Sequence, residues 1–491
     1  MPLTVISLWR IAVSWFFIND DSSYEKLRKW LRTEAARLGP GERLPSTRWL
    51  IQAHHLSPLT VSRAVAELSR EGVLVSRPGA GTFVAQPRGG SSNPPDYSWQ
   101  TVTLAGRVVD TTGLSPMADP PHPDGVISLA TGYLHSSLIP MAALRSALSQ
   151  AARLPDTWER PPAAGLHPLR SWFARATGSG ADAEDVLITS GAQGALAAVF
   201  RSLVPPGSPL LVESPTYPGA LAAARAAGIQ PTPVPADHDG VIPGHLEEAF
   251  ARTGARALFC QPAYHNPTGA VLAAVRRPAV LAAAAAAGAF VIEDDFARWL
   301  SHHDRPPAPL LRDDADGRVV YITSLTKVAS PSLRVGAVIA RGPVAHRLRA
   351  QRAVDDMFVS RPLQEAALDL VSRPGWDRHL GELSRSLGRR ARLLFQAVTD
   401  CLPAVDVVLP AGGTHLWARL PQHLDDSEAA AAARRAGVIV MPGRPFFPAE
   451  PPAPHVRLAF SAAASEAELD EAVRRLAAAV PELTSPGNAC H

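Results

Sequence analysis

The chain has 491 residues, enough for two or three domains, and 46% of them are apolar. Together with a mean hydropathy of +0.02, this composition excludes a largely disordered chain and a membrane-embedded one. The net charge is only +3, but residues 21–90 hold 11 Lys/Arg against 6 Asp/Glu. This basic N-terminal part indicates one domain that faces a polyanion.

The first 20 residues give a mixed signal. The run Ile11–Ile18 is apolar and follows Arg10, as in a signal peptide, but it is short and lacks a small-residue cleavage site. It is also far shorter than the roughly 20 apolar residues that a spanning helix needs. We expect a segment that packs on the first domain; a mis-chosen start codon and an export signal are the alternatives. We expect no membrane contact, and the scattered cysteines (Cys260, Cys401 and Cys490) fit a reducing cytoplasm without a metal site.

Residues 22–86 carry the signals of three short helices and a hairpin. Serines at 22 or 23, 46 and 57 can each cap a helix, and apolar residues follow each serine at helical spacing. Gly39-Pro40-Gly41 stops the first helix and Glu71-Gly72 the third. Two apolar runs, 73–75 and 82–84, flank a glycine-containing turn. Three helices and a hairpin predict a winged helix-turn-helix within residues 1–86.

Four motifs in this segment resemble the DNA-binding domain of the GntR superfamily: Leu44-Pro45-Ser46-x-Arg48, Thr60-Val61-x-Arg63-Ala64, Leu68-x-x-Glu71-Gly72 and Arg77-Pro78-Gly79-x-Gly81-Thr82-Phe83-Val84. The resemblance implies that the third helix enters the major groove of double-stranded DNA while the wing touches the backbone or minor groove. The DNA contacts that it implies are Arg48, Ser57, Thr60, Ser62, Arg63, Arg77 and Gly79. Ser57-Pro58-Leu59 stands where the family usually has an arginine, so one expected contact is missing. A winged helix used only for protein contacts is the alternative.

A linker separates this segment from the rest of the chain. Residues 87–124 mix Gly/Ser-rich and Pro-rich stretches, which is typical of linkers. Beyond it, residues 125–485 alternate apolar runs (186–189, 209–212, 256–260, 289–293 and 318–322) with helical stretches. This alternation predicts an α/β fold with a doubly wound, mostly parallel sheet and a ligand at the C-terminal edge of its strands. We expect a smaller C-terminal subdomain from about residue 345.

Polar residues suited to one cofactor follow these predicted strands. Asp294 ends an apolar run, Asn266 opens a turn, and Lys327 closes the polar tract that begins at Ser324. Lysine can form a Schiff base with pyridoxal phosphate, a carboxylate can pair with the protonated pyridine nitrogen, and an amide can reach the ring hydroxyl. Ser324 and Arg334 would take the phosphate. A lone loop lysine is usually a solvated charge, but the ordered set favours a cofactor site.

This order of parts resembles the fold-type-I aminotransferases over roughly residues 125–480. The resemblance implies Lys327 as the Schiff-base lysine, Asp294 as the pyridine partner and Asn266 as the ring-hydroxyl ligand. The tract Ser190-Gly191-Ala192-Gln193 looks like the family's phosphate cradle, in which amides at a helix N-terminus face an anion. Tyr217 resembles the aromatic residue that stacks on the cofactor ring. Arg457 resembles the arginine that binds a substrate carboxylate bidentately.

A winged helix joined to such a body resembles the MocR-type regulators of the GntR superfamily. The resemblance implies a cytoplasmic, homodimeric transcriptional regulator that binds a DNA operator and senses pyridoxal phosphate, or an amino acid or amine condensing with it. The alternative is a pyridoxal-phosphate-dependent aminotransferase with an accessory DNA-binding module, and Arg457 leaves a transaminase half-reaction open. Departures from the pattern argue against efficient catalysis: Phe296 stands where a tyrosine is common, His265 where a glutamine is frequent, and Trp158 near an expected tyrosine.

Overall fold

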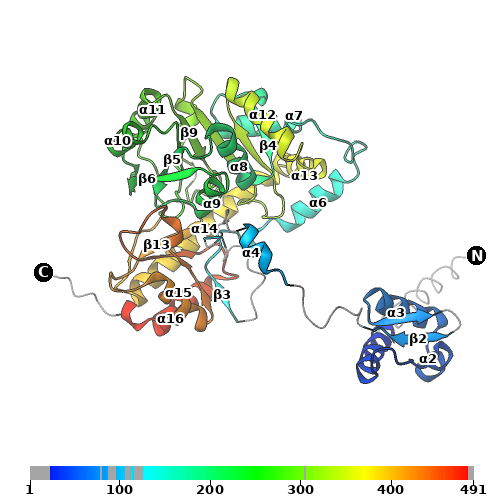
Figure 1. The fold of residues 1–491 in the computed structure, drawn as a ribbon. Helices are drawn as coiled ribbons and strands as arrows, with labels where there is room; N and C mark the ends of the chain where they lie inside the picture. Colours follow the sequence, from blue (N-terminus) through cyan, green and yellow to red (C-terminus); the bar gives the residue numbers. More distant parts are fainter. Residues whose placement is uncertain are drawn as a thin grey trace, which may run out of the picture. The chain divides into compact units, whose positions relative to one another are not determined.

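The structure, a computed structural model, describes residues 23–77, 80–86, 96–104, 111, 113–114, 125–303 and 306–484 (Figure 1). The chain divides into two compact units, Met1–Val108 and Val109–His491. The expected N-terminal segment 1–20, Gly79 and most of the expected linker 87–124 lie outside the described residues. Within that linker, α4 (Ser98–Leu104) is a helix that the sequence pattern does not predict. No helix among the described residues is both long and apolar enough to cross a membrane.

The N-terminal unit is a winged helix-turn-helix. Its described elements are a helix at 23–37, α2 (Thr47–His54), α3 (Pro58–Arg70), β1 (Leu74–Arg77) and β2 (Gly81–Val84). Ser46 and Ser57 cap α2 and α3 as predicted, each accepting a hydrogen bond from a backbone N–H of the first turn. The two wing strands pair antiparallel. Leu27, Leu50 and Leu68, one from each helix, are buried in a single apolar core.

Among the residues that the structure describes, the second unit forms a mostly parallel sheet of eight strands, as predicted. In sheet order these are β4 (Val186–Thr189), β11 (Gly336–Ile339), β10 (Val319–Ser324), β9 (Phe290–Asp294), β8 (Ala257–Cys260), β5 (Pro209–Ser214), β6 (Gln230–Asp237) and β7 (Gly240–Val241). The pairs from β10 to β6 are parallel, whereas β11 and β7 run antiparallel to their neighbours. Asp294 and Ser324 therefore end adjacent strands at the same edge.

Helices cover both faces of this sheet (Figure 1). On one face lie α8 (Gly191–Leu203), α9 (Pro218–Ala226) and α12 (Pro343–Asp355), and on the other α7 (His167–Thr177), α10 (Pro243–Thr253) and α11 (Arg277–Ala286). Alternate strand residues supply the two cores: Val186 and Ile188 of β4 belong to one and Leu187 to the other. Two further helices, α6 (Met141–Ala151) and α13 (Arg361–Ser372), pack against each other. The predicted doubly wound α/β fold is confirmed.

The last part of the chain forms a second, smaller sheet. After the long helix α14 (Gly375–Cys401), its strands are, in sheet order, β12 (Asp406–Val407), β13 (His415–Arg419), β16 (His455–Ala459) and β15 (Met441–Pro442). The helix α15 (Asp426–Arg435) packs beside it, and α16 (Glu466–Ala479) packs against α14 and α15. β14 (Val438–Ile439) pairs with β3 (Ile127–Ser128), so the beginning of this unit contacts its C-terminal part. Short 3-10 helices lie at Ser136–Leu138, Ala183–Asp185, Leu310–Asp313, Arg444–Phe446 and Pro481–Leu483. The subdomain boundary near residue 345 stays a prediction.

The five predicted strands are present, each within two residues of its expected bounds. The sequence pattern does not predict β6, β7 or β11. In β6, prolines stand at 231, 233 and 235, which argues against a strand because proline has no N–H to donate. The N–H of Gln230 donates to the Ser208 carbonyl on the β5 side, so the nitrogens of prolines 231, 233 and 235, at alternate positions, face away from β5 and the pairing with β5 survives.

Candidate cofactor and DNA sites

One cavity lies at the C-terminal edge of the large sheet. All but one of the predicted cofactor and carboxylate-binding residues line it: Ala192, Gln193, Tyr217, Asn266, Asp294, Ser324, Lys327, Arg334 and Arg457. The remaining one, Gly191, lies next to the guanidinium of Arg334. The fold therefore brings together a set that the sequence spreads over most of the second unit.

Lys327 lies in the loop after β10. Its Nζ donates a hydrogen bond of 3.2 Å to the carbonyl oxygen of Gly132 and lies 3.8 Å from the centre of the Tyr133 ring. Burial and the charge of Arg457 lower the pKa of the Lys327 amine to about 7, against an opposing effect of Asp294. A substantial fraction of this amine is therefore neutral, and nucleophilic, at neutral pH.

Asp294, the last residue of β9, is buried beside this lysine. Gln261 Nε2 donates to Asp294 Oδ2 at 2.7 Å, whereas Asp294 Oδ1 is buried with no hydrogen-bond partner among the described residues. Burial raises the pKa of Asp294 to about 7, although the Gln261 hydrogen bond lowers it in part. A cationic N–H donor at Oδ1 would satisfy this atom and favour the ionised carboxylate.

An anion cradle lies at the start of α8. The first backbone N–H groups of this helix, from Gly191 onward, have no partner within the helix. Arg334 Nη2 donates to the carbonyl oxygen of Ser190 at 2.7 Å, which holds the guanidinium at the helix start. A Cβ on Gly191 would lie 2.9 Å from that nitrogen, and Gly191 has a φ of +76°, so the position requires glycine. Ser324, which donates to Thr326 Oγ1 at 2.7 Å, lines the same cavity.

Tyr217 and Gln193 support each other in the cavity wall. The Tyr217 hydroxyl donates to Gln193 Oε1 at 3.1 Å, and Gln193 Nε2 donates to the carbonyl oxygen of Gly219 at 2.9 Å. A Cβ on Gly219 would lie 2.3 Å from the Tyr217 ring, so only glycine allows the ring to lie there. Burial raises the pKa of Tyr217. Tyr217 is thus a neutral aromatic residue in a fixed position.

Arg457 reaches the cavity from β16 of the small sheet. Its Nη1 donates to Asn266 Oδ1 at 3.0 Å and its Nη2 donates to the carbonyl oxygen of Ala130, whereas Nε is buried without a partner among the described residues. The guanidinium carbon lies 5.1 Å from the centre of the Phe446 ring. Burial lowers the pKa of Arg457 to about 10, so the side chain stays charged at neutral pH. The two sheets meet at this site through the Arg457–Asn266 hydrogen bond.

The predicted DNA contacts lie on α2, α3 and the wing. The exposed ones are Arg48, Ser57, Ser62, Arg63 and Arg77. Thr60, by contrast, is only 5% exposed, and its hydroxyl lies 2.8 Å from Ser57 Oγ at the start of α3. Thr60 therefore has the least surface to offer DNA. Gly79 lies outside the described residues.

Aromatic rings orient two of these arginines. The guanidinium carbon of Arg63 on α3 lies 5.0 Å from the centre of the Tyr24 ring, and that of Arg77 on the wing lies 4.9 Å from the centre of the Phe83 ring. Such cation–π contacts restrict a long side chain without removing its charge. Both guanidinium groups are thus held at the surface.

Family models match both units of the chain. Residues 124–476 match the model for aminotransferase class I and II, and residues 21–84 match the model for bacterial regulatory proteins of the gntR family. The chain belongs to the aminotransferase class I and II family. With a GntR domain at its N-terminus, this family member is a DNA-binding transcriptional regulator of the MocR type.

Individual relatives of this aminotransferase-family regulator support the assignment. The uncharacterized HTH-type transcriptional regulator YdfD of Bacillus subtilis is 26% identical, and the HTH-type transcriptional regulator TauR of Rhodobacter capsulatus is 29% identical; each match covers 91% of this chain and 93% of the relative. The crystal structure of LysN, an alpha-aminoadipate aminotransferase from Thermus thermophilus complexed with N-(5'-phosphopyridoxyl)-L-leucine, is 28% identical with a TM-score of 0.73. That match covers 79% of this chain and 99% of LysN.

Pyridoxal phosphate is the cofactor of the class I and II family, and the body of this regulator is of the pyridoxal-phosphate-binding type. The cavity fits this group chemically. It offers a partly neutral amine on Lys327, a buried acceptor on Asp294 that has no donor among the described residues, and an anion cradle formed by Gly191 and Arg334. These are the partners that the aldehyde, the pyridine nitrogen and the phosphate require.

Several cavity residues are absent from the sequence predictions. Gln261 directly follows β8, so the rule that ligands lie at the C-terminal ends of parallel strands could have found it. No motif points to His415, which begins β13 of the small sheet. The structure also locates two of the residues that depart from the family pattern. Phe296 lines the cavity, and His265 Nε2 lies 3.3 Å from Glu213 Oε2.

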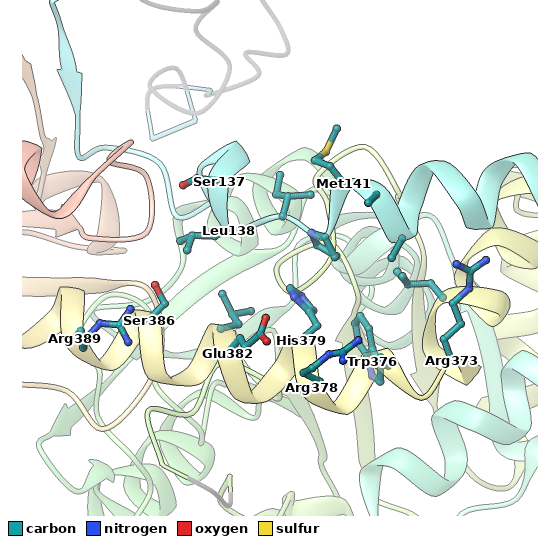
Figure 2. A pocket seen from close by; sticks show the side chains of 17 residues that line it. Ser137, Leu138, Met141, Arg373, Trp376, Arg378, His379, Glu382, Ser386 and Arg389 are labelled. Atoms are coloured by element: carbon teal, nitrogen blue, oxygen red, sulfur yellow. The ribbon is translucent and has the colours of Figure 1, made fainter.

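A separate groove of about 700 Å³ lies between the start of α6 and α14 (Figure 2). Figure 2 shows Ser137, Leu138 and Met141 on one side and a row of α14 side chains on the other. Within that row, His379 Nε2 donates to the carbonyl oxygen of Val328 at 2.9 Å. α14 therefore fixes the backbone next to Lys327.

Proposed function

We propose that Lys327 holds pyridoxal phosphate covalently in this cavity. Asp294 would pair with the ring nitrogen through Oδ1, Tyr217 would stack on the ring, and Asn266 would contact the ring hydroxyl. The phosphate would be bound by Gly191, Ala192, Gln193, Ser324 and Arg334. Two observations support these roles: Asp294 Oδ1 has no partner in the described part of the chain, and the cradle requires glycine at position 191.

The bound cofactor supplies an aldehyde that reacts with primary amines and a ring that withdraws electrons. The residues around it set the conditions for binding. Lys327 presents an amine that is partly neutral at neutral pH, because its pKa is lowered to about 7. Asp294 holds a negative charge once a cation at Oδ1 offsets its burial. Arg457 stays charged and can bind a carboxylate in two hydrogen bonds.

We infer that an amino acid or amine entering the cavity is the effector of this regulator. The observation that carries this inference is that Arg457 and Lys327 line one cavity, in a chain that also has a winged helix. A carboxylate-binding group and an amine-reactive group in one cavity suit an amino acid. An effector changes DNA affinity only if it binds one arrangement of the protein better than another.

We also propose a cytoplasmic homodimer whose two winged helices bind paired half-sites. On α6 and the segment after it, Met141, Leu148, Leu154 and Trp158 are 42%, 48%, 38% and 78% exposed. Several exposed large apolar side chains within one short stretch of chain are typical of a surface that a partner covers. Light scattering should give twice the mass of one chain, and Trp158→Asp should lower it. A monomeric wild-type protein at micromolar concentration contradicts the dimer.

Footprinting on the promoter beside the protein's own gene tests the sensor role. The apoprotein, the cofactor-loaded protein and the loaded protein with amino acids should differ in affinity for DNA with two half-sites. Lys327→Ala should bind this DNA but lose the difference. Equal affinity of all three wild-type forms contradicts the sensor role and favours the alternative function, an aminotransferase.

An aminotransferase is the second candidate, because Lys327 and Arg457 share the cavity. The loaded protein is mixed with amino acids, and absorbance follows conversion of the cofactor from its aldehyde to its amine form. Conversion with release of one keto acid per site demonstrates a half-reaction. Phe296 in place of a hydroxyl-bearing residue leads us to expect slow conversion or none.

A further inference from the structure

His415 lines the cofactor cavity next to Arg457. Across the ladder between β13 and β16, His415 pairs with Ala459, and Arg457 pairs with Trp417. Residues two positions apart in a ladder project from the same face of the sheet. His415 and Arg457 therefore enter the cavity as diagonal neighbours, both from the small sheet.

The His415 ring is buried (3% exposed), and within the part of the chain that the structure describes only one of its two nitrogens has a partner. Its Nδ1 lies 3.2 Å from Thr414 Oγ1, whereas Nε2 has no hydrogen-bond partner among the described residues. The Pro267 carbonyl lies near the ring and opposes the lowering of its pKa, but Nε2 makes no hydrogen bond of ordinary geometry to it. Burial and the charge of Arg457 lower the pKa of His415 well below its ordinary value, so the ring is neutral. When the Thr414 hydroxyl donates to Nδ1, the single ring proton is on Nε2.

We propose that His415 Nε2 donates a hydrogen bond to the effector's carboxylate, next to the guanidinium of Arg457. A buried N–H without an acceptor is unfavourable, and a carboxylate oxygen satisfies it with a charge-assisted hydrogen bond. Three groups then recognise the effector: Lys327 lies at the position of its amine, and Arg457 and His415 bind its carboxylate. The site therefore selects an amino acid over the corresponding amine. This inference rests on the proposed function, because it needs an amino compound in the cavity.

The test compares an amino acid with the amine that lacks its carboxylate. Cofactor-loaded wild-type protein is titrated with the twenty common L-amino acids and L-2-aminoadipate, by absorbance and by calorimetry. The variants are then titrated with two ligands: the amino acid that gives the largest response and its decarboxylated amine, for example L-leucine and 3-methylbutylamine. His415→Phe should weaken amino-acid binding on the order of tenfold or more and leave amine binding unchanged. His455→Phe is the matched control, because His455 stacks on Trp417 in the same sheet without lining the cavity.

Two further variants keep the test decisive if His415→Phe fails to load cofactor. His415→Gln can place an amide N–H near the position of Nε2, whereas His415→Asn reaches only near Nδ1. The Gln variant should bind the amino acid more tightly than the Asn variant. Equal loss for amino acid and amine would show that His415 only shapes the cavity. Unchanged amino-acid binding in His415→Phe overturns the inference alone, whereas a wild-type protein that responds to no amino acid overturns the proposed effector as well.

Discussion

Gln261 connects two of the proposed cofactor ligands: its Nε2 donates to Asp294 Oδ2 at 2.7 Å, and its Oε1 accepts a 3.2 Å hydrogen bond from the backbone N–H of Asn266. One side chain thus orients both residues. It also leaves Asp294 Oδ1 as the carboxylate oxygen without a partner among the described residues. Because Gln261 is 2% exposed, water does not replace it easily.

Gln261→Leu should therefore weaken binding of pyridoxal phosphate. The change leaves a buried carboxylate oxygen and a buried N–H without partners, at roughly 1–3 kcal/mol for each group. We expect a loss of affinity of roughly tenfold or more in a fluorescence titration of the apoprotein. Gln351→Leu, which removes an exposed hydrogen bond to Asp355, is the control and should bind normally. Equal affinities for the two variants would exclude the positioning role.

Lys327→Ala should abolish the covalent cofactor band. The variant lacks the only side-chain amine that lines the described cavity, so cofactor should be lost on gel filtration. Circular dichroism should show an unchanged fold. An unshifted band that survives gel filtration in the variant would disprove the assignment of Lys327.

Gly191→Ala should lower the affinity for pyridoxal phosphate, because the new Cβ crowds Arg334 in addition to straining the backbone. Its Cβ would lie 2.9 Å from Arg334 Nη2, and its φ of +76° adds about 1–2 kcal/mol of strain. Gly178→Ala is a matched control, with φ of +62° and no atom within 4 Å of the new Cβ. Both variants should lose thermal stability, but only Gly191→Ala should lose affinity for pyridoxal phosphate. Equal cofactor affinities would argue against the cradle.

Cofactor capture should accelerate as pH rises through about 7. Only the neutral amine of Lys327 can react, and its pKa is lowered to about 7, so the reactive fraction reaches one half near that pH and levels off at higher pH. Asp294, whose pKa is raised to about 7, ionises over the same range and adds to the rise. Stopped-flow absorbance between pH 5.5 and 9 measures the rate. In Asp294→Asn, the pH range over which the capture rate rises should move lower, because the Asp294 charge that raises the pKa of Lys327 is gone. A rate that still climbs near pH 10 would contradict the lowered pKa of Lys327.

DNA binding should weaken steeply with salt, because each neutralised phosphate contributes roughly −0.9 to the log–log slope. Arg63→Ala should lower specific affinity by about 1–3 kcal/mol if Arg63 reads a base edge. An equal loss on random DNA would identify a phosphate contact instead. Arg37→Ala, at an exposed position paired with Glu34, should leave both affinities unchanged.

Local patterns were sufficient to predict much of the molecule. The caps at Ser46 and Ser57 act within one turn of helix, so the sequence around each one determines where α2 and α3 begin. Asp294 and Ser324 follow apolar runs, and parallel strands end at a common edge, which brings these residues to one cavity. The pattern does not predict β6, whose prolines argue against a strand unless the paired side of the strand is known.

The sequence alone therefore determined the winged helix, the doubly wound sheet and the order of the candidate cofactor residues along the chain, since each rests on periodicity or on neighbours in the chain. Only the tertiary structure decided which atoms face one another. Gln261 meets Asp294, Arg334 takes the space beside Gly191, and His415 shares a sheet face with Arg457. These contacts join residues far apart in the chain, and packing of the two sheets and their helices sets them. No local periodicity encodes such packing, so hydrogen bonds across the cavity become visible only in the folded molecule.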